Sequence, residues 1–176
     1  MEGLRILGID PGTRYMGVAV LHGEQLVHYG VKDLKRKRPA DELLRATRDA
    51  LLQLIRDYRP TVLAYENTFY VQQKSSALLH VQELEIKRVG KAEHLQVLGY
   101  SPSHLRKRLC GDGWATKYMV ADLLAERFPE LTGYRTKNEP RRERYWLNMF
   151  DAVAVAVVCA EEIGSIESSG SRRRAA

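Results

Sequence analysis

The sequence predicts a single α/β domain with a mixed β-sheet covered by helices. Three strand patterns open the sequence, and helix and strand patterns then alternate. The chain has 176 residues, a length that suits one domain, and neither an internal repeat nor a low-complexity linker divides it. Hydrophobic residues make up 44% and charged residues 28%, which is typical of globular proteins and excludes a disordered or fibrous chain.

The first three strands are predicted from apolar runs that end at turn signals. They cover residues 4–10, which stop at Pro11-Gly12-Thr13, and residues 17–21 and 25–31. The link His22-Gly23-Glu24 between the last two suits a hairpin. These residues therefore predict the antiparallel part of the sheet.

The rest of the chain alternates between helix and strand patterns. In residues 41–58 the apolar positions fall on one helical face, and Arg59-Pro60 ends that helix. The elements predicted after it are a strand at 61–65, a helix of mixed polarity from 75 to about 91, a strand at 95–100, short helices or loops, a helix at 117–128, a loop at 132–140 and a strongly apolar helix from 145 to about 163. We therefore expect one domain over residues 1–164 and a flexible basic tail over 165–176.

The charge balance favours a polyanionic partner. The net charge is +6 and the pI is about 9.4. The basic residues gather in four clusters, Lys35-Arg36-Lys37-Arg38, Arg106-Lys107-Arg108, Arg141-Arg142 with Arg144, and Arg172-Arg173-Arg174. A single cluster is typical of a solvated surface, but four in a short chain favour nucleic acid, because basic groups near phosphates release condensed counterions.

Several other classes are excluded. No apolar run approaches the roughly 18 residues that span a bilayer and no cleavage pattern opens the chain, so we expect a soluble, cytoplasmic protein without a membrane partner. Cys110 and Cys159 are too few for a disulfide framework and lack ligand neighbours for zinc. The chain also lacks a phosphate-binding loop motif, a Gly-x-Ser-x-Gly nucleophile elbow and metal or triad spacing of histidines.

Three carboxylates stand where a metal site is expected. Asp10 and Glu66 each follow a predicted strand, and ligands bind at the carboxyl edge of such sheets. Asp151 enters a helix that is otherwise almost wholly apolar, and Asn148 lies one turn before it on the same face. Such oxygen donors suit Mg²⁺ or Mn²⁺. Each residue also has a structural interpretation: Asp10 caps a turn, Glu66 is a surface charge and Asp151 marks the solvent boundary of its helix.

Four segments together resemble the RuvC-type Holliday junction resolvases, in order and in interval. They are Ile6-Leu7-Gly8-Ile9-Asp10-Pro11-Gly12-Thr13, Glu66 after its strand, Gly111-Asp112-Gly113-Trp114-Ala115-Thr116-Lys117, and Asp151-Ala152-Val153-Ala154-Val155-Ala156. The resemblance runs from about residue 4 to 160. Its specificity lies in the combination, since actin-like sugar kinases and YqgF-type nucleases carry openings similar to the first segment.

The resemblance implies a ribonuclease H-like fold, with a five-stranded mixed sheet flanked by helices, and two divalent metals, Mg²⁺ or Mn²⁺, in each active site. Asp10 would bridge the metals, and Glu66 and Asp151 would ligate them. Asn148 stands where the family usually has a further acidic residue or His; an amide oxygen can ligate a metal but brings no charge. Lys117 would act at the cut phosphate.

The resemblance also implies DNA contacts. Lys117 and Arg106 fall where similar resolvases contact DNA, with Lys107 beside Arg106, and Phe69 falls where they place an aromatic residue that stacks on an unpaired base, with Tyr70 to assist. The structural alternatives are a solvated helix face for the cations and core packing for Phe69. Residues 83–88 are more charged than the helix through which similar proteins dimerise. We still expect a homodimer, because symmetric cutting needs two sites, and branch-migration proteins are further candidate partners.

These features predict a metal-dependent, structure-selective endonuclease that resolves four-way DNA junctions by paired symmetric nicks, in recombination and repair. Two alternatives stay open. One is a nuclease of the same fold acting on RNA or other branched DNA. The other is a junction-binding protein weakened in catalysis at Asn148. A sugar kinase is disfavoured because the chain has no room for a second nucleotide-clasping domain.

Overall fold

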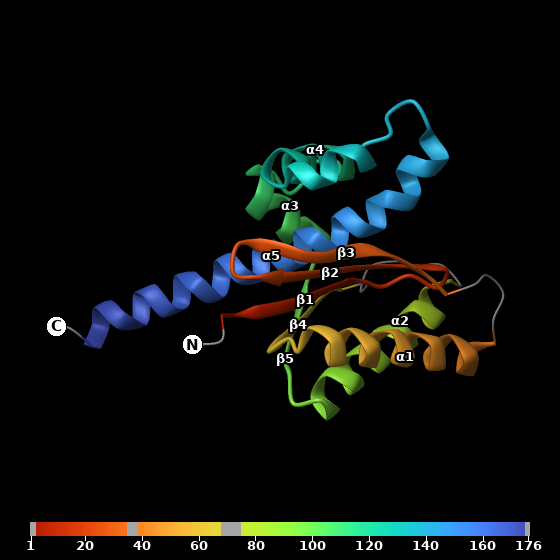
Figure 1. Ribbon diagram of the computed structural model, residues 1–176, viewed down its shortest axis with the longest axis horizontal. Helices are drawn as coiled ribbons and strands as arrows, with labels where there is room; N and C mark the ends of the chain where they lie inside the picture. The colour runs from red at the N-terminus through yellow and green to blue at the C-terminus, as the bar shows by residue number, and fades with distance from the viewer. Residues whose placement is uncertain (1–2, 35–38, 68–74, 175–176) are drawn as a thin grey trace.

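The computed structural model describes residues 3–34, 39–67 and 75–174. Among these residues, five strands form one sheet in the spatial order β3-β2-β1-β4-β5 (Figure 1). The strands are β1 (Arg5–Asp10), β2 (Tyr15–His22), β3 (Gln25–Asp33), β4 (Val62–Glu66) and β5 (Gln96–Tyr100). The pairs β1–β2 and β2–β3 are antiparallel, whereas β1–β4 and β4–β5 are parallel. The five-stranded mixed sheet expected from the sequence is confirmed.

Helices cover both faces of this sheet. They are α1 (Ala40–Tyr58), α2 (Ser75–Ala92), α3 (Pro102–Cys110), α4 (Lys117–Arg127), the 3-10 helix η1 (Pro129–Tyr134) and α5 (Pro140–Arg174). α1 and α2 pack together on one face, while α5 crosses the other face with α3 and α4 beside it (Figure 1). Within the described ranges, no helix combines the length and the apolar character needed to cross a membrane.

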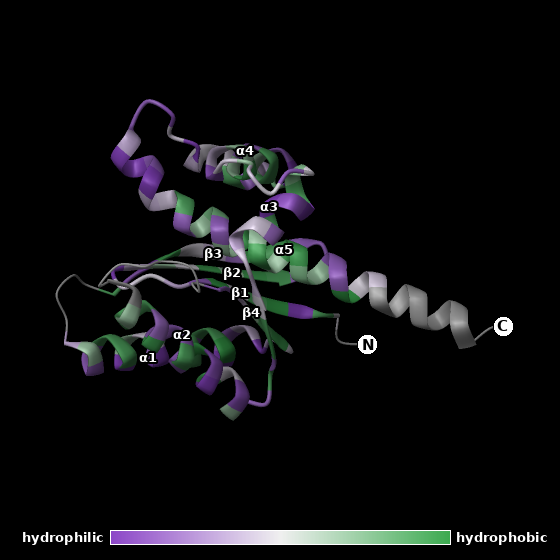
Figure 2. Ribbon diagram, turned by 180° about the vertical axis from the view of Figure 1, so that it is seen from behind, coloured by the Kyte–Doolittle hydropathy of each residue, from purple (hydrophilic) through white to green (hydrophobic). Residues whose placement is uncertain are grey.

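Each face of the sheet has its own hydrophobic core. Successive strand side chains point to opposite faces, so Ile6 belongs to the core under α5 and Leu7 to the core under α1 and α2. The run from Ala152 to Cys159 is fully buried or nearly so, and it forms the hydrophobic middle of α5 over the sheet (Figure 2). The apolar run that the sequence places in one helix is thus buried against the sheet.

The backbone of α5 comes unusually close to the strands at two glycines. A Cβ atom on Gly8 would lie 2.3 Å from the carbonyl oxygen of Ala152, and one on Gly17 would lie 1.8 Å from the carbonyl oxygen of Asn148. Both distances are far below van der Waals contact, so no larger residue fits without moving the helix. Glycine at these positions therefore sets the height of α5 above β1 and β2.

The structure differs from the expected elements near the end of the chain. The loop expected at 132–140 is wrong in part, because η1 covers its beginning and α5 starts at Pro140 instead of Tyr145. Proline is tolerated in the first helical turn, where its missing N–H costs no hydrogen bond. The region left open as helices or loops contains α3, which the Ser101 side chain caps by accepting the His104 N–H at 3.3 Å.

α5 also continues past its expected end at about residue 163, with a helical backbone to Arg174. Two side-chain contacts hold the turns around the expected end. Glu161 forms an ion pair with Arg127 of α4 at 2.6 Å, and Glu162 is hydrogen-bonded to the His104 ring of α3 at 2.7 Å. The division into a domain at 1–164 and a flexible tail at 165–176 stays a prediction.

Candidate active site

Three acidic side chains converge at one edge of the sheet. Asp10 ends β1 and Glu66 ends β4, and these neighbouring parallel strands are paired at Ile9 and Tyr65. α5 adds Asp151 from above. One carboxylate oxygen from each of the three acids lies within 4.8 Å of the other two. The structure therefore brings together the three acids that the sequence analysis selects.

The glycine contacts of α5 explain how Asp151 reaches this edge. A Cβ atom on Gly17 would meet the carbonyl oxygen of Asn148 and would also lie 3.1 Å from the Cβ of Asp10. The turn of α5 that carries Asn148 and Asp151 therefore rests directly on the β1–β2 pair beside Asp10. Because the contact is backbone against backbone, the position of Asp151 does not depend on flexible side chains.

Negative charge on these clustered acids is unfavourable unless a cation is bound, because the acids are largely removed from water and repel one another. The pKa of Asp10 is raised well above its usual value by burial and by the charges of Asp151 and Glu66. Burial and Asp151 also raise the pKa of Glu66 to about 7, against the opposing effect of Lys117. The pKa of Asp151 is raised by burial, although Lys117 opposes this shift as well. Raised pKa values in clustered acids indicate negative charge that a bound cation would stabilise.

Lys117 is the principal cation at the cluster. It is the first residue of α4, where the Thr116 side chain caps the helix by accepting the Met119 N–H at 3.2 Å. Its Nζ donates a hydrogen bond to Asp151 Oδ2. Burial lowers the pKa of Lys117, but Asp151 and Asp10 outweigh that effect and raise its pKa above the usual value. Lys117 is therefore charged at neutral pH and directed at the acids.

The other expected site residues lie at different distances from the acids. Arg106 of α3 is half-buried and near enough to lower the pKa of both Glu66 and Asp151. Lys107 is exposed on the same helix. Phe69 and Tyr70 lie outside the described residues.

Asn148 is half-buried on α5, one turn before Asp151. Its Nδ2 donates to the carbonyl oxygen of Tyr145 at 2.9 Å and to that of Arg144 at 3.4 Å. The amide nitrogen is thus engaged by its own helix. Metal ligation through the side-chain oxygen of Asn148 stays a prediction.

The residues present fit a divalent metal. Asp10, Glu66 and Asp151 offer carboxylate oxygens, which are the ligands that Mg²⁺ and Mn²⁺ prefer. Two buried acids and the half-buried Glu66 face one lysine and a nearby arginine, so the cluster keeps negative charge for a cation to stabilise. Among the described residues the cluster contains carboxylates and no cysteine, which favours hard metals over softer ones.

One residue that supports the turn after Asp10 was not identified from the sequence. Gln82 of α2 is completely buried, and its Nε2 donates to the carbonyl oxygen of Gly12 at 3.2 Å and to Thr47 Oγ1 at 3.1 Å. Gly12 belongs to the turn that follows Asp10, so α2 anchors this turn from the opposite face of the sheet. The available signal was a polar residue between Leu78 and Ile86 at the four-residue spacing of a buried helical stripe.

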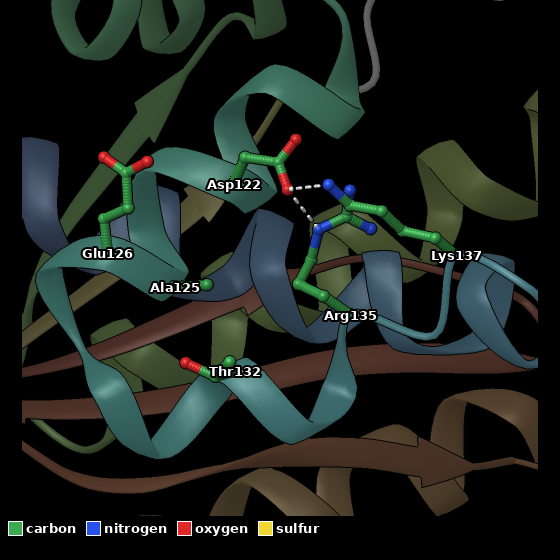
Figure 3. Close-up of a pocket in the computed structure, with 6 residues that line it drawn as sticks. All are labelled: Asp122, Ala125, Glu126, Thr132, Arg135 and Lys137. Atoms are coloured by element: carbon green, nitrogen blue, oxygen red, sulfur yellow. Dashed lines mark hydrogen bonds and ion pairs between the residues drawn. The ribbon is translucent and has the colours of Figure 1, made fainter.

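A surface hollow of about 610 Å³ lies elsewhere, between α4 and η1 (Figure 3). Arg135 enters it and bonds to Asp122 at 2.9 Å, and Lys137 pairs with the same carboxylate at 3.3 Å. Arg135 also pairs with Glu143 of α5. These ion pairs fasten the segment after η1 to α4 and α5, and we assign the hollow no ligand.

Comparison with known sequences identifies the family of the chain. The model of the family described as crossover junction endodeoxyribonuclease RuvC matches residues 6–159. A protein of that name from Ralstonia nicotianae is 35% identical over 126 residues, which cover 69% of this chain and 70% of the relative. Another from Wolinella succinogenes is 28% identical over 169 residues, covering 91% of this chain and 96% of the relative.

Solved structures support the fold. The Thermus thermophilus RuvC structure superposes with a TM-score of 0.68 at 24% identity, covering 87% of this chain and 91% of the other. T. thermophilus RuvC in complex with a Holliday junction substrate gives a TM-score of 0.70 at 23% identity, with coverage of 87% and 90%. RuvC structures have a ribonuclease H-like fold, which confirms the fold that the resemblance implies. By its sequence over residues 6–159, this chain belongs to the RuvC family of crossover junction endodeoxyribonucleases.

Proposed function

We propose that this chain is a metal-dependent, structure-selective endonuclease that resolves four-way DNA junctions by paired symmetric nicks. The observation that carries the proposal is the convergence of Asp10, Glu66 and Asp151 within 4.8 Å, beside Lys117, in a member of a junction endonuclease family. Buried acids with raised pKa values are costly for the fold, and a metal-dependent phosphodiesterase uses such a cluster.

Asp10, Glu66, Asp151 and Asn148 would hold two Mg²⁺ or Mn²⁺ ions in each active site. Bound metal ions of this kind activate water and stabilise the leaving oxygen during in-line attack on a phosphodiester. The role of Asp10 as the ligand shared by both ions is proposed on the family resemblance, and its carboxylate lies within reach of those of Glu66 and Asp151.

The cations would position the DNA. Lys117 is charged and lies within hydrogen-bond reach of Asp151, so it can pair with the phosphate that is cut. Arg106 acts on the same acids from α3, and exposed Lys107 would contact a neighbouring phosphate. We assign Phe69 and Tyr70 to stacking on a base at the junction centre, by family resemblance alone.

Paired nicks across a junction require two such sites, and we propose a homodimer for this reason. Branch-migration proteins are proposed as further partners on the family resemblance.

The main alternative is a protein that binds junctions but cuts them poorly. It is favoured by Asn148, whose neutral amide supplies no negative charge and donates to its own helix. The replacement Asn148→Asp separates the two functions. If the native chain is disabled at this position, the replacement raises cutting by orders of magnitude; if Asn148 suffices, the rate changes little.

The deciding experiment is cleavage of a labelled synthetic four-way junction in Mg²⁺, in Mn²⁺ and in EDTA, with linear duplex as the control. We expect paired, metal-dependent nicks, and we expect Asp10→Asn to reduce the rate by at least about a thousandfold, since it removes a negatively charged metal ligand. Junction binding should survive that replacement, because phosphate contacts are retained. Equal loss of binding and cutting in Asp10→Asn would contradict the assignment of Asp10.

Lys117→Ala tests the role of the site lysine. We expect it to slow cutting by about a hundredfold, because it removes a charge-assisted contact in a partly buried site. The matched control is Lys91→Ala, which removes an exposed lysine from the last turn of α2. Similar losses in the two variants would mean that Lys117 contributes only general electrostatic attraction.

A further inference from the structure

Exposed apolar side chains gather next to the candidate active site. The large apolar side chains exposed in the described part of the chain are Val27, Val81, Leu84, Trp114, Tyr118 and Met119. The last three fall within one short segment, at the start of α4 and in the turn before it. Trp114 is 92% exposed, Met119 52% and Tyr118 44%. We call these three residues the Trp114 patch.

The turn that carries Trp114 is held by several hydrogen bonds. The Trp114 N–H donates to Asp112 Oδ1 at 2.9 Å, and the Ala115 N–H donates to the carbonyl oxygen of Asp112 at 3.2 Å. Ala115 itself is buried, and Thr116 caps α4. Trp114 is thus presented outward by a fixed turn, with its ring in contact with solvent.

Cations flank this exposed ring. Lys117, three residues later, reaches the acidic cluster at Asp151. On the other side, the turn packs against α3: a Cβ atom on Gly113 would lie 3.3 Å from the carbonyl oxygen of Ser103 and 4.0 Å from the Cβ of Lys107. The turn that carries Trp114 therefore lies between the helix of Lys107 and the helix that begins at Lys117, and the Asp112 carboxylate is bound at its backbone. An exposed aromatic ring between basic side chains is the arrangement that binds single-stranded nucleic acid, with phosphates on the cations and a base on the ring.

We propose that Trp114 stacks on an unpaired base of the DNA strand that is cut, within a few nucleotides of the cut phosphodiester. The proposal rests on the function proposed above and adds a base-binding position on α4 to it. The Cα atoms of residues 114 and 117 are at most about 11 Å apart, since three residues span no more. That reach corresponds to about three rises of 3.4 Å along a strand.

The observations favour DNA over a partner protein as the occupant of the patch. The segment that exposes Trp114 is the same one that delivers Lys117 to the acids, so the ring lies only three residues from the cation at the site. Both flanking side chains are basic, which suits a phosphate backbone better than an apolar protein surface. Stacking on a tryptophan is tolerant of sequence, because every base has an aromatic face.

The test uses tryptophan fluorescence, because the chain contains only two tryptophans. Trp146 packs against Tyr134 and Tyr145 and is half-buried, so Trp146→Phe leaves Trp114 as the only reporter. The protein is titrated with a four-way junction in EDTA, which prevents cutting, while anisotropy of a label on the DNA follows binding independently. We expect Trp114 emission to be quenched at the same DNA concentrations at which the anisotropy rises.

Substitution provides the second measurement. We expect Trp114→Ala to weaken junction binding by about five- to a hundredfold, and Trp114→Phe to restore most of the loss. Because Trp114 is exposed, both variants should unfold at the temperature of the native chain. Val27→Ala, which truncates an exposed apolar side chain on β3, is the matched control and should bind as the native chain does.

The outcomes are distinguishable. If the native chain neither binds nor cuts the junction, the proposed function fails and this inference fails with it. If the native chain binds and cuts while Trp114 emission stays constant, the inference alone is overturned. Binding and cutting by Trp114→Ala at native levels would overturn it as well, and would leave the patch to a protein partner.

Discussion

Two glutamates on opposite sides of the sheet have opposite pKa shifts. On the face covered by α1 and α2, the carboxylate of Glu85 accepts hydrogen bonds from Arg48 at 2.6 Å and from Arg88 at 2.8 Å. These bonds, that of Arg88 first, lower the pKa of Glu85 to about 2. At the edge under α5, burial and Asp151 raise the pKa of Glu66 to about 7. Two glutamates of one small domain therefore titrate on opposite sides of their usual value.

This difference distinguishes a carboxylate that is paired within the protein from carboxylates that are available to a ligand. The α1–α2 face also buries Thr47 and Gln82, which hydrogen-bond to each other. The charge of Glu85 on this face is paired with arginines within the protein. The acids at the sheet edge under α5 have fewer positive charges than negative ones around them. Charge that the fold leaves unsatisfied marks the place where a ligand binds. The following predictions test this contrast.

The largest effect is expected where α5 touches the strands. Gly17→Ala places a Cβ against the Asn148 carbonyl and forces α5 outward, so we expect a loss of about 3 kcal/mol or more in unfolding free energy. The displaced Asp151 should also abolish most cutting. Urea denaturation and junction cleavage measure the two effects.

The matched control is Gly30→Ala on β3, where a Cβ would meet nothing within 4 Å. This variant should be neutral or slightly more stable, because alanine lowers the entropy of the unfolded chain. Equal destabilisation by both replacements would show that the close approach of α5 is unimportant.

An intermediate effect is expected on the opposite face. Glu85→Gln removes the carboxylate that pairs two arginines, and we expect a loss of about 2 kcal/mol at pH 7, less than the whole pKa shift implies because Arg88 is largely exposed. Since the folded-state pKa is depressed, this stabilisation is present above the unfolded pKa of about 4.5 and is lost as pH falls toward about 2. Urea titrations at several pH values should show the native and variant curves converging below pH 4.5.

Asp41→Asn is the control for that measurement, since Asp41 pairs with Arg45 at 3.9 Å and both side chains are exposed. It should change stability by no more than a few tenths of a kcal/mol. A difference between Glu85→Gln and the native chain that is independent of pH would argue against the ion pairs as its cause.

The smallest effect is expected at the contact between Gln82 of α2 and the turn that follows Asp10. Gln82→Met keeps the side-chain volume but removes the hydrogen bonds to the Gly12 carbonyl and to Thr47, at a cost of about 1 kcal/mol in stability. A less fixed turn should also raise the Mg²⁺ concentration for half-maximal cutting about threefold. Gln96→Met, which replaces an exposed side chain of β5, should alter neither quantity. A change in stability without a change in the Mg²⁺ requirement would restrict Gln82 to a packing role.

Much of the fold could be predicted from local patterns. The strands β1, β2 and β4, the amphipathic α1 and the apolar middle of α5 bury apolar side chains as their patterns indicate, whereas β3 stays partly exposed. Asp10 and Glu66 lie close together because parallel strands bring their carboxyl ends to one edge, which follows from the predicted topology. Their roles, and those of Lys117 and Asn148, stay predictions.

What could not be predicted depends on contacts between distant residues. The close approach at Gly8 and Gly17 exists only once α5 lies on the sheet, and the bond from Gln82 to Gly12 joins residues far apart in sequence. The early start of α5 at Pro140 depends on tertiary support, because Glu143 is buried against Arg135. Propensity alone does not contain these interactions.

The placement of Asp10 and Asp151 has a consequence for synthesis of the protein. The two acids lie about 140 residues apart in the sequence, and the cluster is incomplete until both have left the ribosome. At about 5 to 20 residues per second, the second acid is added roughly 7 to 30 s after the first. A nascent chain therefore displays its cationic and sheet surfaces well before it has a complete acidic cluster. The nascent chain cannot present all three acids to a metal ion until its last long helix lies over the sheet.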